Sequence, residues 1–401
     1  MIEIILFAVA GCALGVLTGL IPGLHVNTIT LLLTGFAVVG NPYNIVIVII
    51  AMAITHTIFD FVPSVFLGAP EADTALSVLP GHMLLLTGRG IHAIYLTVMG
   101  GVGGMLLTLI LFFPMLVIIP FIYQNIQNYI HIILIGIVVV MVFTERGTKK
   151  LCALLIFFLS GILGMLTLNA YILPLHIVLF PVFTGLFGMS ALVISANKKP
   201  NIPKQNTRLP RIKNKIIISG VVKGVFSGMF LGVLPGVGAA QATVLTQQIT
   251  RKNNIQEFLI SIGTINTVVA LFSLISLYTI SRARSGAAVA VENLIEVFGF
   301  TDLLILLGVA LFATGISSLL LMKILNPMVK VLEKINYSKM TKSIIVFLVI
   351  MTLVLAGPIG LLVLFVSTAI GILPIVYGVK RSMSMGVLML PLIMFYSGIF
   401  I

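Results

Sequence analysis

The chain has 401 residues, of which 60% are hydrophobic and 8% are charged. Lys and Arg number 23 against ten Asp and Glu, which gives a formal net charge of +13. A bilayer-spanning helix takes about 20 apolar residues, and such runs follow one another along most of the chain. The composition therefore excludes a soluble globular protein and predicts an all-α, polytopic protein of the cell (plasma) membrane.

The basic residues lie between the hydrophobic runs rather than along one helix face. This pattern excludes nucleic-acid binding and favours cytoplasmic loops beside anionic lipid headgroups. Cys12 and Cys152 both lie in apolar runs, so we expect no disulfide framework. The first apolar run begins at Ile4 without a basic region before it, and we interpret it as mature structure rather than a signal peptide.

Two interrupted apolar segments carry nearly the same sequence. Residues 15–33 read GVLTGLIPGLHVNTITLLL and residues 228–246 read GMFLGVLPGVGAAQATVLT, so that Pro22-Gly23 aligns with Pro235-Gly236. Matched, interrupted segments in two halves of a chain are typical of the binding site of a secondary transporter. We interpret each segment as a re-entrant hairpin, which enters and leaves on the same membrane face.

A helix that begins just after such a break points its unpaired N–H groups at the cavity before it, and these groups favour an anion. Small and polar residues follow both breaks. The predicted substrate-binding residues are Gly23, His25, Asn27, Thr28 and Thr30 in the first segment and Gly236, Gly238, Gln241 and Thr243 in the second. The alternative is a pair of proline kinks packed against neighbouring helices.

The stretch from His56 to Gly90 carries ionisable residues in an apolar context, which is costly and typical of function. Asp60 ends a hydrophobic run and could coordinate a cation or carry a proton. Glu71 and Asp73 follow a Gly-Ala-Pro break, where they could serve the same ion or only favour a helix N-terminus. We predict a coupling-ion site of Thr55, Asp60, Glu71 and Asp73, with Na⁺ or H⁺ as the ion and no other cofactor or metal centre.

Residues 198–215 form the one soluble-looking stretch, with seven Lys or Arg and no acid. By the positive-inside rule this stretch is an exposed cytoplasmic linker. It divides the chain into a first transmembrane repeat at 1–197 and a second at 216–401.

We expect an odd number of crossings, five, in each half, so the two repeats are inverted. Residues 63–86 and 285–302 are interpreted as a second re-entrant hairpin in each repeat. With the N-terminus outside, the basic clusters at 146–150, 251–252, 323–342 and 380–381 fall inside, and only Arg282 and Arg284 fall outside. The expected spans are 44–61, 91–113, 122–143, 151–168, 170–192, 255–280, 303–322, 343–357, 361–378 and 385–401.

The second half adds polar residues to the predicted substrate site. Asn266 and its neighbouring threonines lie inside a span, where they could bind substrate or a neighbouring helix. Arg284 precedes Ser285 at a break in the apolar pattern. A planar guanidinium binds a carboxylate through two parallel hydrogen bonds, although such an arginine can also simply reach the outer interface. We include Asn266, Arg284 and Ser285 in the substrate site.

These motifs resemble the large membrane subunit of tripartite tricarboxylate transporters, the TctA-type permeases. The family's G-x-x-P-G break occurs here as Gly19-Leu-Ile-Pro22-Gly23 and Gly232-Val-Leu-Pro235-Gly236, and its P-G-E-A type segment is similar to Ala69-Pro70-Glu71-Ala72-Asp73. The likeness covers residues 10 to 300. It departs from the family pattern at Pro80-Gly81, where the family has Asp-Gly. The resemblance implies ion-driven uptake of organic carboxylates, with a small membrane subunit and an extracytoplasmic binding protein as partners.

The sequence contains no nucleotide-binding loop, nucleophile elbow or catalytic triad, so we expect no enzyme. The leading prediction is a permease for a small organic anion, a carboxylate, moved by alternating access in symport with Na⁺ or H⁺. The alternative is a translocase for a lipid-linked phosphate such as polyprenyl phosphate, because two anion-binding helix tips suit a phosphate headgroup equally well. A non-transporting membrane scaffold is the third hypothesis. The sequence leaves open whether the chain forms a homo-oligomer.

Overall fold

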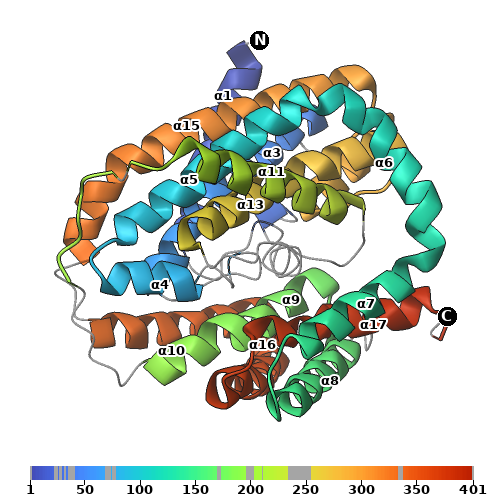
Figure 1. Cartoon of the computed structure of the whole chain (residues 1–401). Coiled ribbons are helices and arrows are strands. Elements are labelled where there is room, and N and C mark those ends of the chain that lie inside the picture. The colour runs from blue at the N-terminus through green and yellow to red at the C-terminus, as the bar shows by residue number, and fades with distance from the viewer. Residues whose placement is uncertain are drawn as a thin grey trace.

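The chain folds into helices throughout the part that the structure describes (Figure 1). The structure is a computed structural model that describes residues 2–21, 26, 29–30, 33–34, 41–67, 74, 78–168, 173–195, 203–209, 211–233, 254–332 and 337–399. No strand occurs within these ranges. The expected all-α architecture is therefore confirmed.

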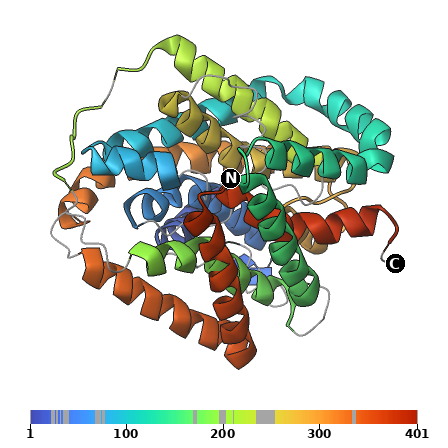
Figure 2. The same cartoon turned by 60° about the horizontal axis from the view of Figure 1, so that its bottom comes forward.

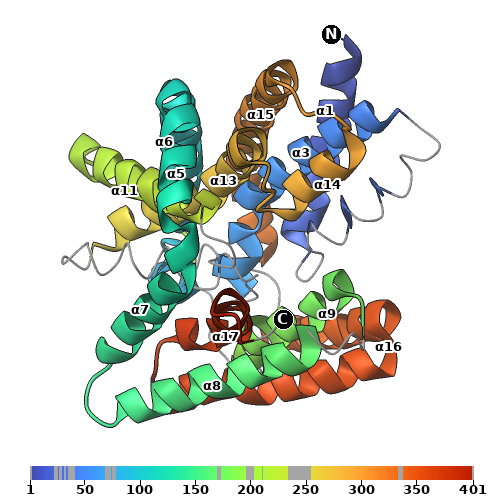
Figure 3. The same ribbon diagram turned by 90° about the vertical axis from the view of Figure 1, so that its right-hand side faces the viewer.

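The helices form two layers, which Figure 3 shows one above the other. The first layer has one continuous apolar core to which both halves of the chain contribute. Its members are α1 (Ile2–Leu20), α3 (Pro42–Phe59), α4 (Val78–Leu86), α5 (Gly90–Ile110), α6 (Phe112–Ile126), α11 (Asn214–Val233), α13 (Ile255–Ile280), α14 (Gly286–Leu294) and α15 (Phe300–Leu332). A π-helix, η1 (Pro63–Leu67), follows α3.

The second layer also takes helices from both halves, and smaller apolar clusters hold it together. A 3-10 turn, η3 (Gln127–Tyr129), connects it to α6. Its members are α7 (Ile130–Phe143), α8 (Lys149–Leu168), α9 (Leu175–Phe183), the π-helix η4 (Thr184–Met189), α10 (Ser190–Ser195), α16 (Tyr337–Tyr377), the 3-10 helix η5 (Arg381–Met385) and α17 (Gly386–Tyr396).

Ten helices among the described residues are long and apolar enough to cross a membrane. Most of them coincide with expected spans, but α1 and α11 differ. Each has a 19-residue apolar stretch, the length of a full span, whereas the sequence pattern had assigned these residues to hairpin arms. The apolar run before each Pro-Gly break is thus longer than a hairpin arm requires.

The C-terminal spans also differ from expectation. The predicted spans 343–357 and 361–378 correspond to the two arms of α16, which is broken at Gly357 by a backbone φ of 63°. Figure 2 shows the two arms meeting at an angle. The predicted span 385–401 is only the 11-residue helix α17. The 3-10 turn η5 precedes it and takes up part of the apolar run.

Each half begins with a close pair of helices, α1 against α3 and α11 against α13. Gly11 of α1 lies against Val48 of α3. Gly19, near the C-terminal end of α1, lies against Phe59, at the C-terminal end of α3. The contacts advance in the same direction along both helices, so α1 and α3 run parallel. A stripe of small residues lets two backbones approach this closely.

The second pair repeats these contacts in the same register. Gly232 lies against Phe272, just as Gly19 lies against Phe59, and an added Cβ at either glycine would lie 2.6 Å from the phenylalanine Cβ. The other matched contacts are Gly11–Val48 with Gly224–Ser261 and Gly15–Thr55 with Gly228–Val268. Each residue in these α1–α3 contacts is separated from its counterpart in the α11–α13 contacts by the same number of residues. The two halves therefore share a packed unit, beyond the sequence identities around the breaks.

The helix caps follow the same offset. The side-chain oxygen of Asn41 accepts a hydrogen bond from Tyr43 N at the start of α3, at 2.9 Å. At the start of α13, the side-chain oxygen of Asn254 accepts from Gln256 N at 3.1 Å. An asparagine that satisfies a first-turn N–H fixes where a helix begins. Both central helices therefore begin at equivalent positions.

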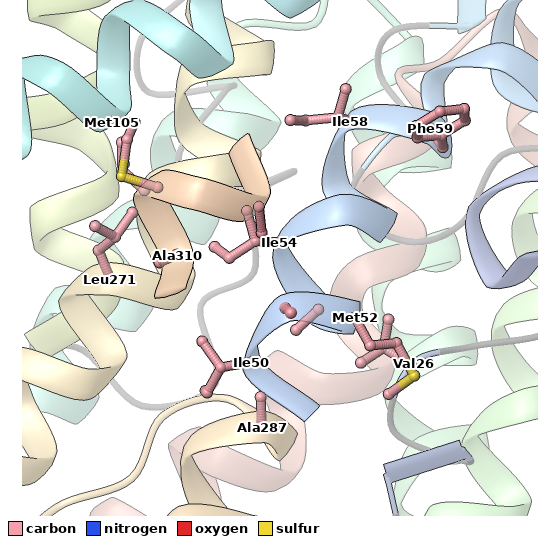
Figure 4. Packing of buried hydrophobic residues seen from close by; sticks show 14 of the residues in the cluster. Val26, Ile50, Met52, Ile54, Ile58, Phe59, Met105, Leu271, Ala287 and Ala310 are labelled. Atoms are coloured by element: carbon pink, nitrogen blue, oxygen red, sulfur yellow. The ribbon is translucent and has the colours of Figure 1, made fainter. Parts of the chain in front are cut away.

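Helices α3 and α13 lie at the centre of the first layer and are almost wholly buried. Figure 4 shows Ile54 of α3 directed toward Ala310 of α15, and Ile50 near Ala287 of α14. Met52 lies beside Val26. Because neighbours cover both central helices, a polar side chain on either one is held inside the bundle.

Most of the described residues of the basic linker are exposed, but Gln205 is buried in the first layer. The Gln205 side chain is 5% exposed. Its Oε1 accepts from Gly90 N at 2.7 Å and its Nε2 donates to Leu85 O at 3.1 Å. It thus satisfies backbone groups at the end of α4 and the start of α5.

Candidate substrate and ion site

Asp60 lies where α3 gives way to a π-helix. Its backbone N–H still donates to His56 O at 2.9 Å, but Pro63 cannot donate and the regular helix does not continue. Short π-helices often occur at functional sites. The Asp60 side chain is 3% exposed and lies at the edge of the central core. The sequence therefore places a carboxylate at a backbone break inside the bundle.

Asn266 of α13 reaches this carboxylate from the other half of the chain. Its Nδ2 lies 3.0 Å from Asp60 Oδ2 and 3.3 Å from Oδ1, and 3.1 Å from Thr57 O. Asn266 is itself buried. The amide thus binds both the carboxylate and the last turn of α3, and it joins two residues that were predicted separately, one for the ion and one for the substrate.

A second polar contact connects α3 to α1 just before the first Pro-Gly break. His56 Nδ1 lies 3.1 Å from Thr18 Oγ1, and the Thr18 hydroxyl donates to Gly15 O at 3.2 Å. Both side chains are buried. This contact ties the end of α1, which leads into the break, to the helical turn that carries Asp60.

In the second half, the position equivalent to Asp60 is Ser273, at the same offset that relates Gly19 to Gly232. The Ser273 hydroxyl accepts a hydrogen bond from Arg284 N at 2.9 Å. The Arg284 guanidinium lies over the Tyr123 ring, 5.6 Å from its centroid. Its Nε and Nη2 are buried and have no hydrogen-bond partner among the described residues. This guanidinium thus retains donors for an anion.

Ser285 has a structural role in this region. Its hydroxyl accepts from Ala288 N at 3.2 Å and caps α14. Thr55 is fully buried, and its side chain lies against Gly15 of α1. Thr30 is buried, and its hydroxyl has no hydrogen-bond partner in the part of the chain that is described.

The remaining predicted site residues lie outside the described part of the chain. They are Gly23, His25, Asn27 and Thr28 after the first break, Gly236, Gly238, Gln241 and Thr243 after the second, and Glu71 and Asp73. Their placement therefore remains a prediction. Within the described ranges, no group of three or more His, Cys, Asp or Glu side chains gathers as a metal site would require.

Sequence analysis missed Thr18 and Ser273 as members of this region. Ser273 could have been found, because extending the alignment of the two Pro-Gly segments at constant offset places it opposite Asp60. Thr264, which lies near Asn266, packs elsewhere: its hydroxyl donates to Gly100 O of α5 at 2.8 Å. It therefore serves helix packing, one of the two roles left open for it.

Ten helices among the described residues are long and apolar enough to cross a membrane, and one of them carries the buried carboxylate of Asp60. This defines a multi-pass membrane protein with a buried polar site, an arrangement typical of transporters. The chain belongs to the tripartite tricarboxylate transporter TctA family, whose family model matches residues 5–386. Family membership indicates a transport role rather than catalysis. The resemblance drawn from the motifs is confirmed, and it extends beyond residues 10 to 300.

The chain is also 30% identical, over 98% of both chains, to an uncharacterized protein of Methanocaldococcus jannaschii. No solved structure matches the chain.

Proposed function

We propose that the chain is an ion-coupled secondary transporter that carries a small organic carboxylate across the membrane. The contact between Asp60 and Asn266 carries this proposal. A carboxylate inside a membrane-spanning bundle is costly and is typical of ion or proton pathways. Here it is 3% exposed and is held by an amide from the other half of the chain. The coupling ion, Na⁺ or H⁺, binds at Asp60.

Ion binding at Asp60 would change the contact between the two halves. The ionised carboxylate accepts hydrogen bonds from Asn266 through both oxygens. A proton or Na⁺ that binds the carboxylate occupies oxygen lone pairs and neutralises the negative charge. Both now contribute to the hydrogen bonds with the Asn266 amide. A ligand shifts a conformational equilibrium when it binds the two states with different affinity. The state in which α3 and α13 separate is therefore favoured by ion binding.

Inverted repeats are supported by the directions of the central helices. The start of α5 at Gly90 lies against Phe66, just beyond the end of α3, so α5 runs back in the opposite direction to α3. α5 runs parallel to α13, because Thr97 lies against Gly263 and Gly104 lies against Val268 further along both helices. The equivalent helices α3 and α13 therefore run in opposite directions, as inversion requires.

The proposed re-entrant segments are supported by the parallel helix pairs. The start of α1 lies beside the start of α3, where Asn44 Nδ2 donates to Glu3 Oε1 at 2.7 Å. Asn41 therefore lies at the end of the layer where α1 begins, and Ile21 lies at the end where α1 finishes. In the second half, Lys223 of α11 forms an ion pair with Glu257 at the start of α13. We propose that the substrate carboxylates bind at the tips of these two segments and at Arg284.

The proposed partners are the small membrane subunit and the extracytoplasmic binding protein of a tripartite system. Membership of a tripartite transporter family supports this part of the proposal. We expect the small subunit to remain bound to the chain during purification in mild detergent.

The test uses purified full-length protein in two assays. Melting temperatures with mono-, di- and tricarboxylates should rise for at least one class, because a ligand that binds only the folded state stabilises it. Proteoliposomes should then accumulate that carboxylate under an imposed Na⁺ or H⁺ gradient. The proposal fails if no carboxylate shifts the melting temperature and none is taken up. Stabilisation by a polyprenyl phosphate in their place would favour the lipid translocase.

A further inference from the structure

Two loops of the second layer that are distant in sequence meet at one end of the bundle. One is the turn between α7 and α8, and the other connects α16 to η5. Lys380 N donates to Glu145 Oε1 at 3.0 Å, and Lys149 Nζ donates to Gly378 O, also at 3.0 Å. A further bond runs from Lys380 Nζ to Thr144 Oγ1 at 2.9 Å. These bonds fix both loops in one place.

The joined loops and the first turn of α8 carry an excess of positive charge. Arg146 and Lys380 lie on the loops, Lys149 and Lys150 begin α8, and we call these four residues the two-loop cluster. Glu145 is the acid of these loops, and it is buried and engaged by the backbone of Lys380. Each ammonium has three donors, and Lys149 and Lys380 use one apiece among the described residues. Donors therefore remain for an anion.

Apolar side chains that face outward border the cluster. Phe143, Leu151 and Tyr377 are 68%, 72% and 50% exposed, and each lies in or at the end of a candidate membrane span. Lys150 Nζ lies over the Phe143 ring, 4.8 Å from its centroid. The positive charges thus lie at the level where spans end, directly beside surface that is suited to acyl chains.

We propose that the two-loop cluster binds the headgroup of an anionic phospholipid, whose acyl chains lie along Phe143 and Leu151. Basic pockets at the ends of membrane helices recognise anionic headgroups in this way. A soluble anion would use the charges but not the apolar border. Because the cluster joins α7–α8 to α16–η5, the bound lipid stabilises the second layer.

The test measures lipid binding by the purified full chain with native mass spectrometry. Protein from nanodiscs with equal amounts of dioleoylphosphatidylglycerol and dioleoylphosphatidylcholine should retain the anionic lipid preferentially. The variant Lys149→Gln/Lys150→Gln/Lys380→Gln should lose affinity by about five-fold for each lysine removed. The matched control Lys204→Gln/Lys213→Gln/Lys215→Gln removes the same charge from exposed linker positions and should retain the lipid as the wild type does.

Two outcomes would overturn the proposal. One is equal retention of phosphatidylglycerol by the wild type and the cluster variant. The other is full displacement of the lipid by millimolar inorganic phosphate, which would indicate a site for a soluble anion. If the triple variant does not fold, Lys150→Gln alone decides the matter. The Lys150 ammonium makes only its contact with the Phe143 ring among the described residues, so its removal should lower affinity without unfolding the protein.

Discussion

At the scale of single residues, Asp60 and Asn266 connect the two halves of the chain at the proposed ion site. A hydrogen bond to a charged group contributes more to stability than one between neutral groups. In a membrane bundle the unfolded state also finds partners, so the measured values are modest. The Asn266 amide binds the carboxylate and Thr57 O together. The pair therefore fixes the end of α3 against α13.

A double-mutant cycle measures this contact. Asn266→Ala should lower the free energy of unfolding in the wild-type background more than in an Asp60→Asn background. We expect a coupling energy of about 1–2 kcal/mol at neutral pH, measured by unfolding in mixed detergent. As a matched control, Thr264→Val removes a hydroxyl that donates to Gly100 O, and it should be additive with Asp60→Asn. A coupling energy near zero for the Asn266 cycle would mean that the two side chains do not interact in the membrane protein.

At the scale of helices, the repeated glycine contacts make α1–α3 and α11–α13 equivalent units. A methyl group at Gly19 or Gly232 would meet the Cβ of a buried phenylalanine at 2.6 Å. Overpacking of this kind forces helices apart and costs about 1–3 kcal/mol. Alanine at a helical glycine with space around it causes no such overpacking. It only replaces a flexible residue in the helix with a less flexible one.

Gly19→Ala and Gly232→Ala should therefore lower stability by similar amounts, about 1–3 kcal/mol each. Gly136 and Gly308 have no atoms within 4 Å of an added Cβ. Alanine at these control positions should be neutral or stabilise by up to about 1 kcal/mol, because alanine favours a helix over glycine. Thermal unfolding in detergent compares the four variants. Equal melting temperatures for all four would show that the parallel pairs are not closely packed.

The tips after the two breaks are predicted to bind the anion mainly through backbone N–H groups. Gly23→Val and Gly236→Val should both abolish carboxylate binding, because a branched side chain occupies the ligand's place and restricts the backbone. Thr28→Ala or Gln241→Ala should weaken binding by only about 0.5–1.5 kcal/mol, the net contribution of one hydrogen bond. Isothermal titration of the folded variants distinguishes these effects. Normal binding by both valine variants would rule out the paired tips.

The sequence predicts the membrane-spanning helices better than it predicts the contacts between them. Long apolar runs identify most spans, because a bilayer demands length and hydrophobicity from each helix separately. The pairing of Asp60 with Asn266 joins residues 206 positions apart, and no local pattern reveals such a contact. The role of Gln205 was missed for the same reason, since its backbone partners belong to α4 and α5. The four-residue spacing of Gly11, Gly15 and Gly19, in contrast, is a local pattern typical of a close helix pair, and the sequence analysis did not use it.

At the scale of the whole molecule, the first layer joins the two halves through α5 against α13 and α15 against α3. The third long helix of each half therefore packs on the central helix of the other half: α5 packs on α13, and α15 packs on α3. The second layer likewise combines α7–α10 with α16 and α17. A movement of one half relative to the other would have to break these shared contacts and a further one, between the end of α3 and α13, where Asp60 binds Asn266.

The inverted topology is tested with single cysteines in a Cys12→Ser/Cys152→Ser background. Arg282 and Arg146 are both exposed, and they are expected on the outer and inner faces. A membrane-impermeant maleimide added to intact cells should label Arg282→Cys and leave Arg146→Cys unlabelled until the membrane is opened. Labelling of both from the same side would exclude the proposed arrangement of spans.

The most direct measurement compares accumulation with exchange in proteoliposomes that contain wild type or Asp60→Asn. The control Asp302→Asn changes another acid, one whose carboxylate accepts from Gly299 N at 3.0 Å at the start of α15. If Asp60 binds the coupling ion, Asp60→Asn should abolish gradient-driven accumulation of the carboxylate and retain counterflow exchange. Wild type and Asp302→Asn should perform both. Accumulation at the wild-type level by Asp60→Asn would contradict the assignment of the coupling ion to Asp60.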